Sequence, residues 1–300
     1  MKKVKVLFFI VLFPCSVFSQ QWHSYSDSIY QIIKVKFDQN LYDRADKFIQ
    51  LADKDIEKSK VSEDTIYADY MYRKGVVKYY LGKFDNVPFD KSLSIWELNK
   101  KKNYSKIMKN YFFLGAGYHL KLDYSKAYEN YEICYLINKK NNLPFNNNLA
   151  LSMYYLAVID YNTNLNYKKA EQYALEYIEY NKENAILNFD FNYPYAYKMM
   201  DDSLGYEKAF LDLKKSYEDR NINDKPLYFK INYELLLHYY YQNKPKEVIL
   251  YGEKTLELSP FSGLKNDKYL KDLYEILTRA YSQIKDDANR IKYENLLKNY

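Results

Sequence analysis

Side chains that could carry catalysis or hold a metal are few in this sequence and lie far apart. The 300 residues include 3 His and 2 Cys. His23, His119 and His238 have no neighbouring Cys or His at the spacing of a zinc site. A nucleophile also needs a base and an orienting acid close to it, and no segment places such groups together. We therefore expect no cofactor, no metal and no enzymatic activity.

Short motifs that resemble chemical sites have simpler structural explanations. Gly115-Ala116-Gly117 is a bare G-x-G within a helical pattern, so we expect it to serve helix packing rather than phosphate binding. Asp201-Asp202 and Asp286-Asp287 are paired carboxylates at predicted turns, where helix capping explains them. Lys100-Lys101-Lys102 is expected to be a solvated loop.

The composition indicates a globular protein built from helices. The chain has 7 Gly, 7 Pro and 38 Tyr, and so few turn-forming residues argue against a many-stranded sandwich or barrel. The formal net charge is +6 at pH 7. This mild excess gives no reason to expect a nucleic-acid partner.

The N-terminus has the pattern of a secretory signal peptide. A basic start, Met1–Lys5, precedes an apolar run from Val6 to Phe13 and small residues up to Ser19. We expect cleavage after Ser19, which removes three lysines and leaves a net charge of 6 − 3 = +3. An uncleaved N-terminal anchor is one alternative. Cys15 raises lipidation as another, but the preceding Pro14 fits a lipobox poorly. The apolar run is too short to span a membrane, and no later segment approaches that length.

A short string recurs about every forty residues. Each copy has a large or rigid residue followed three positions later by a small apolar one. The copies are Tyr42–Ala45, Phe84–Val87, Tyr124–Ala127, Tyr167–Ala170, Tyr206–Ala209 and Pro245–Val248, with a degenerate seventh at Asp287–Arg290. Such a near-constant period predicts a repeat architecture.

Each string lies between two helical patterns, so the repeating unit is a helix hairpin. Asp123 and Asn166 are placed to cap the helices that begin at the third and fourth strings. Pro245 fits the first turn of a helix, and Pro260 is expected to end one. The small residue of each string should lie where the two helices come closest.

These residues resemble the tetratricopeptide repeat (TPR) family. The third unit shows Leu114-Gly115-x-x-Tyr118, then Tyr124-x-x-Ala127, and the sixth shows the ending Leu258-Ser259-Pro260. The resemblance covers roughly residues 25–299, with a period of about 41 instead of the usual 34. It implies an all-α, right-handed α-solenoid of about seven stacked hairpins. After a signal peptide at 1–19, the solenoid occupies 20–300, with units near 25–60, 62–100, 104–140, 147–183, 187–220, 226–260 and 267–299.

The resemblance also implies a concave face lined by the first helix of each unit. Carried over unit by unit, one column reads Tyr30, Tyr72, Phe112, Tyr154, Pro194, Tyr233, Glu275, and the other reads Phe37, Tyr79, His119, Tyr161, Asp201, Tyr240, Ser282. Nine of these fourteen residues are Phe or Tyr, where an aromatic share of 19% would give about three. The candidate binding residues are Tyr72, Tyr79, Phe112, His119, Tyr154, Tyr161, Tyr233 and Tyr240. Ordinary packing of a tyrosine-rich chain is the competing explanation.

We interpret the chain as a non-enzymatic, exported binding scaffold that holds a protein or peptide in this aromatic-lined groove. The family's clamp for a peptide carboxylate is not reproduced by Lys34, Lys198 and Arg279. One alternative is a glycan-binding helper, with Asp69, Asn162 and Asp202 as its polar groups. Another is a sensory ectodomain-like partner of a membrane signalling protein. The expected location is the periplasm or cell envelope of a Gram-negative-type bacterium, with secretion as an alternative.

Overall fold

The computed structural model describes residues 39–59, 65–98, 100–141, 143–144, 146–183, 191–261 and 267–298. The expected signal peptide, Tyr30, Phe37 and the first helix of the first unit lie outside these residues. Within them the chain is all α, as the sequence predicts. The elements are α2 (Gln39–Ser59), α3 (Thr65–Tyr80), α4 (Val87–Glu97), α5 (Lys100–Leu120), α6 (Tyr124–Asn141), α7 (Asn147–Asn162), α8 (Tyr167–Glu183), α9 (Asn192–Met199), α10 (Ser203–Asp219), α11 (Lys225–Tyr241), α12 (Pro245–Leu258), the short 3₁₀ helix η1 (Ser259–Phe261), α13 (Asp267–Gln283) and α14 (Asp287–Leu297).

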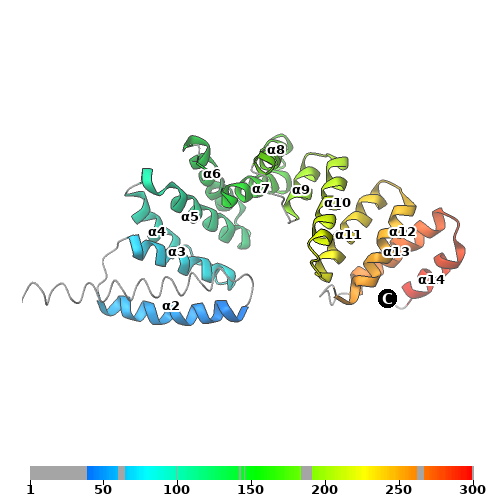
Figure 1. Cartoon of the computed structure of the whole chain (residues 1–300), viewed down its shortest axis with the longest axis horizontal. Coiled ribbons are helices and arrows are strands. Elements are labelled where there is room, and N and C mark those ends of the chain that lie inside the picture. Colours follow the sequence, from blue (N-terminus) through cyan, green and yellow to red (C-terminus); the bar gives the residue numbers. More distant parts are fainter. Residues whose placement is uncertain are drawn as a thin grey trace, which may run out of the picture. The chain divides into compact units, whose positions relative to one another are not determined.

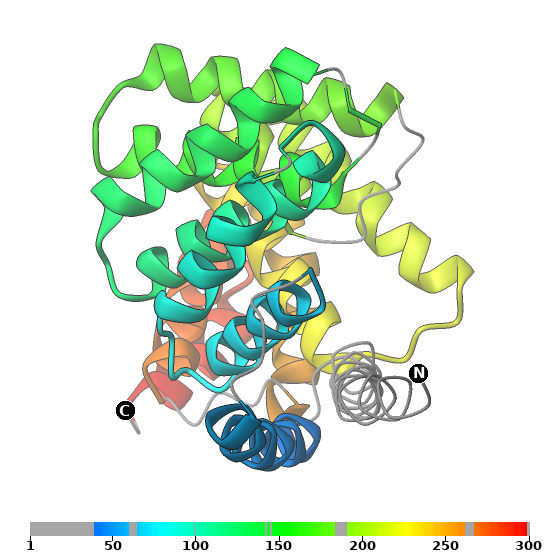
Figure 2. The ribbon, with the colours of Figure 1, turned by 90° about the vertical axis from the view of Figure 1, so that its left-hand side faces the viewer.

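Consecutive helices pair into the predicted hairpins. We number these by the predicted units, so α3–α4 is the second hairpin and α13–α14 is the seventh. The chain divides into two compact units, Met1–Tyr180 and Asn181–Tyr300. In the first unit, α2 packs on α3, α4 on α5 and α6 on α7, so that successive hairpins lie one beside the next (Figures 1 and 2). In the second unit, α10 packs on α11 and α12 on α13 in the same manner.

The hairpin turns share one backbone device. Each turn contains one residue with a left-handed backbone, and in most hairpins this residue lies two positions before the second helix. The residues are Gly82, Leu122, Leu165, Asp201, Asn243 and Lys285. In the third hairpin the Asp123 amide donates to the Tyr118 carbonyl, which closes the end of α5. The Asp123 carboxylate then accepts from the Lys126 amide at 3.2 Å, which confirms the predicted cap of α6.

Two turns depart from the predicted spacing. In the second hairpin, α4 begins at Val87 rather than at Phe84, and the Val87 side chain is exposed. In the fourth hairpin, the Asn166 amide reaches back six residues to the Asp160 carbonyl, whereas the third hairpin reaches back five. This extra residue explains why the interval between the third and fourth strings is longer than most.

In the third and fourth hairpins, small residues occupy the close contact between the paired helices, as predicted. Ala45, Ala127 and Ala170 are fully buried, and Gly115 faces the ring of Tyr131 so closely that a Cβ there would lie 2.8 Å from two ring carbons. Because Tyr131 is itself fully buried, its ring fills the space that a larger side chain at position 115 would need.

Tyrosine hydroxyls link neighbouring hairpins. The Tyr135 hydroxyl of α6 donates to Glu176 of α8 at 2.7 Å. In the second unit, Glu253 of α12 accepts from Tyr281 of α13 at 2.8 Å and from Tyr293 of α14 at 2.6 Å. Each of these rings is buried while its polar tip meets a carboxylate, which satisfies the requirement that a buried hydroxyl be hydrogen-bonded. Much of the high tyrosine content therefore serves the packing of hairpin on hairpin.

Candidate functional site

Two of the predicted binding residues belong to the core. Phe112 is 7% exposed and Tyr154 is 8% exposed. Their rings pack against the second helix of their own hairpins, Phe112 against Tyr131 at 5.9 Å and Tyr154 against Tyr177 at 5.7 Å between centroids. The expectation that these two rings remain open to a partner is wrong, because they seal the contact between paired helices instead.

Half-buried rings in the first unit lie between neighbouring first helices. Tyr72 and Tyr79 of α3 both meet Phe113 of α5, at 5.9 Å and 5.5 Å between centroids. His119 of α5 meets Tyr155 of α7 at 5.4 Å in the same way. Sequence reasoning missed Phe113 and Tyr155. Phe113 directly follows the core residue Phe112, and Tyr155 directly follows the core residue Tyr154. Sequence reasoning could have identified them only if it had placed the buried face of each helix to within one residue.

The remaining ring that was predicted in the first unit, Tyr161, is half-buried against Tyr167 at 5.3 Å. His119 is also half-buried, and burial lowers its pKa, which favours the neutral imidazole. Its Nδ1 atom is buried and makes no hydrogen bond within the described residues. His119 therefore behaves as a further aromatic ring in this layer and not as a charged group.

The fifth hairpin corrects the register of the predicted columns. Its turn lies at Asp201, and the Asp202 amide donates to the Tyr197 carbonyl, the same contact that Asp123 makes to Tyr118. The turn thus comes three residues earlier than the string Tyr206–Ala209 implied. Phe191 and Lys198, and not Pro194 and Asp201, therefore occupy the positions that correspond to Phe112 and His119.

In the second unit, the two predicted tyrosines are half-buried on α11. Tyr233 contacts the ring of Tyr269 at 5.8 Å. The hydroxyl of Tyr240 accepts a hydrogen bond from Arg279 of α13 at 2.7 Å. Both residues thus bridge the sixth and seventh hairpins and keep part of their surface exposed.

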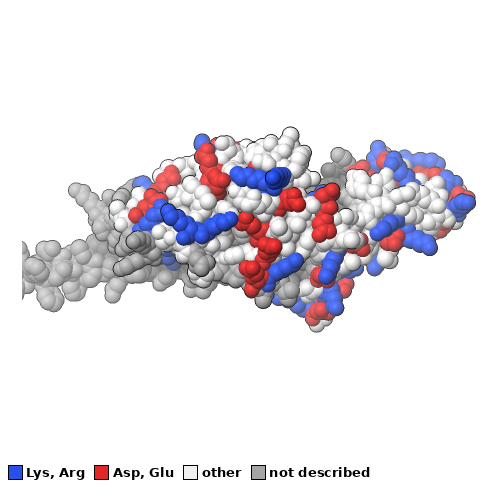
Figure 3. All heavy atoms as spheres, turned by 90° about the horizontal axis from the view of Figure 1, so that it is seen from above, with Lys and Arg blue, Asp and Glu red and all other residues white. Residues whose placement is uncertain are grey.

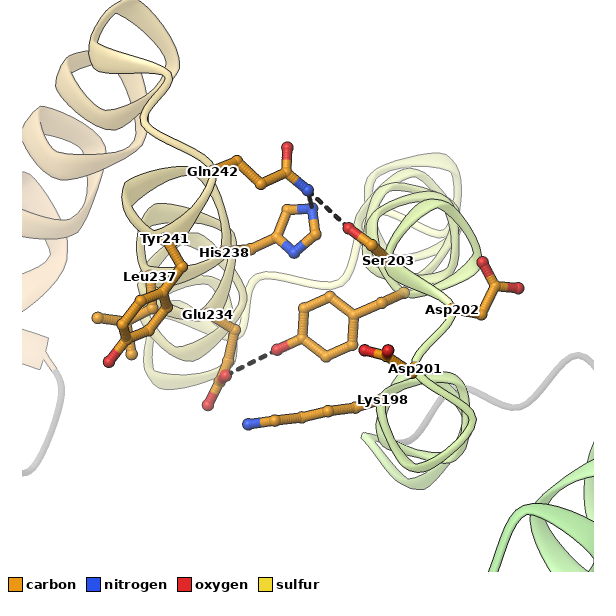
Figure 4. A pocket seen from close by; sticks show the side chains of 10 residues that line it. Lys198, Asp201, Asp202, Ser203, Glu234, Leu237, His238, Tyr241 and Gln242 are labelled. Carbon is orange, nitrogen blue, oxygen red and sulfur yellow. Dashed lines mark hydrogen bonds between the residues drawn. The ribbon is translucent and has the colours of Figure 1, made fainter. Parts of the chain in front are cut away.

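A pocket opens beside these residues, between the fifth and sixth hairpins (Figure 4). Its volume is about 410 Å³, which is within the range of small-ligand and side-chain pockets. The lining residues are Lys198, Asp201, Asp202, Ser203, Tyr206, Glu234, Leu237, His238, Tyr241 and Gln242. They come from α9, the turn after it, the start of α10, and one face of α11.

The fifth hairpin supplies a tyrosine where most other units have a small residue. In the corrected register, Tyr206 holds the place of Ala127 and Ala170. Its hydroxyl donates to one oxygen of Glu234 at 3.0 Å, and the hydroxyl of Tyr195 donates to the other oxygen at 2.6 Å. Two phenol donors hold the carboxylate at the wall of the pocket, where Figure 4 shows Lys198 extending toward it from α9.

The walls combine apolar and charged surface. Leu237 and Tyr241 supply the apolar part, and Tyr241 is 82% exposed. Asp201, Asp202 and Glu234 bring three negative charges against the single positive charge of Lys198, a local balance of 1 − 3 = −2. A ligand group with a positive charge and an apolar stem would complement this lining.

Ser203, His238 and Glu207 lie close together without forming a catalytic relay. Gln242 is interposed: its Nε2 donates to Ser203 Oγ at 2.7 Å and lies 2.8 Å from His238 Nε2. The same Nε2 atom of His238 faces Glu207 Oε2 at 3.5 Å. In a relay, one ring nitrogen faces the nucleophile and the other faces the acid. Burial also lowers the pKa of His238 despite Glu207, so this cluster joins α10 to α11 without activating Ser203.

The polar groups considered for a sugar ligand are occupied within the fold. Asp69 accepts from Lys106 at 2.6 Å, the Asp202 carboxylate caps α10 through the Gly205 amide, and Asn162 donates to a carbonyl of its own helix. Within the described part of the chain, no three His, Cys, Asp or Glu residues are grouped so that they could hold a metal ion. None of the helices in that part is long and apolar enough to cross a membrane.

Comparison with known proteins gives a likeness of fold. No family model matches the chain, and no curated protein matches it. Among solved structures, the apo form of RapI aligns with a TM-score of 0.60 and 14% identity, over 93% of this chain and 97% of that one. BtubC from P. vanneervenii aligns over 94% of this chain and 89% of its own with 15% identity, but its TM-score of 0.36 is too low to support an argument. The likeness to RapI concerns the fold alone and agrees with the helix hairpins described above.

Proposed function

We propose that this protein is a non-enzymatic binding scaffold for a protein or peptide partner. The observation that carries the proposal is the pocket between the fifth and sixth hairpins, where exposed Tyr241 and half-buried Leu237 adjoin the fixed carboxylate of Glu234. Aromatic rings at the edge of a pocket commonly anchor protein partners. The half-buried rings of Tyr233 and Tyr240 on the same helix extend the surface available to a partner.

The charge of the pocket favours a particular kind of side chain. A lysine or arginine of the partner would place its hydrocarbon stem on Tyr241 and its cation near Glu234 and Asp201. Over the visible surface in Figure 3, basic and acidic residues are interspersed, and no broad positive field of the kind that attracts nucleic acid stands out there. A protein or peptide that presents a basic residue is therefore the partner class we favour.

The test is affinity capture from an envelope fraction, followed by mass spectrometry. Wild-type protein is compared with Tyr241→Ala and with Ile291→Ala, an exposed apolar residue on α14 that serves as the matched control. We expect Tyr241→Ala to lose the captured partner and Ile291→Ala to keep it. Aromatic anchors often carry about 2 kcal/mol or more, so a titration of the captured partner should weaken at least about tenfold. Equal capture by wild type and Tyr241→Ala would contradict the proposal, and capture of polysaccharide instead would favour the glycan alternative.

Export by the predicted signal peptide is part of the proposal. If cleavage follows Ser19, protein recovered from the native envelope begins at Gln20. Intact mass and N-terminal sequencing distinguish this form from a chain that begins at a lipid-modified Cys15. The lipidated form would replace the soluble envelope location with attachment to a membrane.

A further inference from the structure

The tips of the third and fourth hairpins expose apolar side chains to an unusual degree. Leu122 is 70% exposed and Leu165 is 62% exposed. Leu120 and Tyr167, beside them in the same two turns, are also more than half exposed. The other hairpin tips have Gly82, Asp201, Asn243 and Lys285 at the position of these two leucines. Other tips also expose apolar side chains, such as Leu204 at 77% and Tyr241 at 82%. Among the described tips, however, an exposed leucine at the left-handed position itself occurs in these two neighbouring tips alone.

The backbone conformation at these two positions is also unusual for leucine. Leu122 has φ of 60° and Leu165 has φ of 52°, the left-handed region that glycine and asparagine adopt most easily. Folding alone would favour glycine or asparagine at these positions, as in the second and sixth hairpins. Exposed leucine is unfavourable here both for its backbone conformation and for its contact with water, so folding stability does not account for it.

The two tips lie at the same edge of the first unit. The helices α5 and α7 pack against each other, and α6 packs on α7, so the turns that follow α5 and α7 are neighbours. Residues 120–126 carry Lys121, Lys126 and one acid, and residues 162–169 carry Lys168 and Lys169 and no acid. The net charge of the two tips is (2 − 1) + 2 = +3. Lys126 pairs with Asp123 at 3.3 Å, and Lys169 pairs with Glu132 of α6 at 3.7 Å. Within the described part of the chain, Lys121 and Lys168 form no ion pair, although Lys121 lies over the Phe84 ring at 4.9 Å from its centroid.

We propose that these two tips dock on an anionic lipid surface. The leucines would enter the boundary between headgroups and acyl chains, and the lysines would meet the anionic headgroups. Tyr167 has the apolar ring and polar tip that suit this interface. A protein partner fits less well, because a stable interface needs about 800 Å² from each side and four side chains on projecting turns offer much less. A lipid surface accepts such isolated projections.

The test uses the full chain and sedimentation with large vesicles. One set contains phosphatidylglycerol and phosphatidylcholine in equal parts, and the other contains phosphatidylcholine alone. The double variant Leu122→Asn with Leu165→Asn removes the apolar tips and keeps the left-handed turns, since asparagine tolerates that conformation. Leu98→Asn, at an 85% exposed leucine of the same unit, is the control. Every variant carries the same first 38 residues, so vesicle binding by that segment is common to all.

We expect wild type and Leu98→Asn to bind the anionic vesicles, and the double variant to bind them at least about tenfold more weakly while melting no lower than wild type. Lys121→Gln with Lys168→Gln should also weaken binding, and added salt should weaken wild type. The proposal is overturned if wild type ignores anionic vesicles or if the double variant binds as well as wild type. It is also overturned if the double variant loses a captured protein while vesicle binding stays unchanged.

Discussion

Gly115→Ala tests how closely the two helices of the third hairpin are packed. In most helices this substitution is favourable, because alanine is preferred over glycine by about 1 kcal/mol in a helix interior. Here the added Cβ would lie 2.8 Å from Cδ1 and from Cε1 of Tyr131, closer than real Cβ atoms approach a ring. Tyr131 is fully buried and stacks on Tyr155 with a centroid distance of 5.2 Å, so its ring has no free space to enter.

The expected size follows from these two opposing effects. Overpacking of a close-packed core costs about 1–3 kcal/mol, and the immobile ring places this site in the upper half of that range. Subtracting the gain of about 1 kcal/mol from helix propensity leaves a net destabilisation of about 1–2 kcal/mol. The free energy of unfolding is measured by urea titration with circular dichroism.

A double-mutant cycle with Tyr131→Leu assigns the loss to this contact. Removing the ring relieves the overlap, so Gly115→Ala should become neutral or stabilising in the Tyr131→Leu background, a coupling of about 1–2 kcal/mol. Gly82→Ala is the control, because Gly82 has φ of 70° and nothing lies within 4 Å of an added Cβ. It should cost about 1 kcal/mol through backbone strain alone and add independently to Tyr131→Leu. A stabilising Gly115→Ala in the wild-type background, or an additive cycle with Tyr131→Leu, would refute this reasoning.

Three further predictions follow from burial. Ala127→Leu should destabilise the protein by about 1–3 kcal/mol because Ala127 is fully buried, whereas Ala288→Leu, at an exposed site of the last hairpin, should change the urea midpoint little. Burial raises the pKa of the Cys134 thiol to about 12, so peptide mapping after iodoacetamide treatment should find Cys134 unmodified in native protein and modified in urea; rapid native labelling would contradict its burial. Burial lowers the pKa of His119 and of His238, so the folded state binds fewer protons than the unfolded chain. The contribution of these two histidines to stability is therefore complete above the unfolded pKa of about 6.5 and is lost as the pH falls through their pKa in the folded state. The drop in melting temperature on acidification should become smaller in His119→Phe and in His238→Gln. An unchanged drop in both variants would contradict this role of the two histidines.

The sequence predicts most of the fold because its signals are local and repeated. The second helices of four hairpins begin where the strings indicate, at Tyr124, Tyr167, Pro245 and Asp287. The caps at Asp123 and Asn166 accept from the amides of Lys126 and Lys169, and α12 ends just before Pro260. Each of these depends on a few neighbouring residues, which is the information that a single sequence contains.

The fifth hairpin shows where such reasoning fails. Tyr206–Ala209 imitates the string three residues late, and a shift of three residues nearly preserves the face of a helix. The true start of α10 is marked by the Asp202 cap and by the left-handed Asp201, which the string pattern ignores. A tyrosine therefore replaces the usual small residue, and the pocket beside Tyr206 was not predictable from the repeat.

Candidate site residues were harder to place because exposure depends on single helical positions. Phe112 and Phe113 are adjacent and chemically identical, yet the first is buried and the second is half-buried between helices. A rotation of about 100° per residue separates the two faces, and the columns could not be aligned that accurately. Aromatic abundance alone also does not separate rings that hold hairpins together from rings that meet a partner.

The shared carboxylate of Glu253 determines how the end of the chain can open. It accepts hydrogen bonds from both helices of the last hairpin, through Tyr281 and Tyr293. If α14 alone frayed, Glu253 would lose the hydrogen bond from Tyr293 and keep the one from Tyr281. The buried contact between the rings of Tyr293 and Tyr281 would be lost in the same step. The last two helices should therefore detach together as a single cooperative step. In native-state hydrogen exchange, the amides of α13 and α14 should then share one opening free energy, and this step should come before any exposure of α11 and α12.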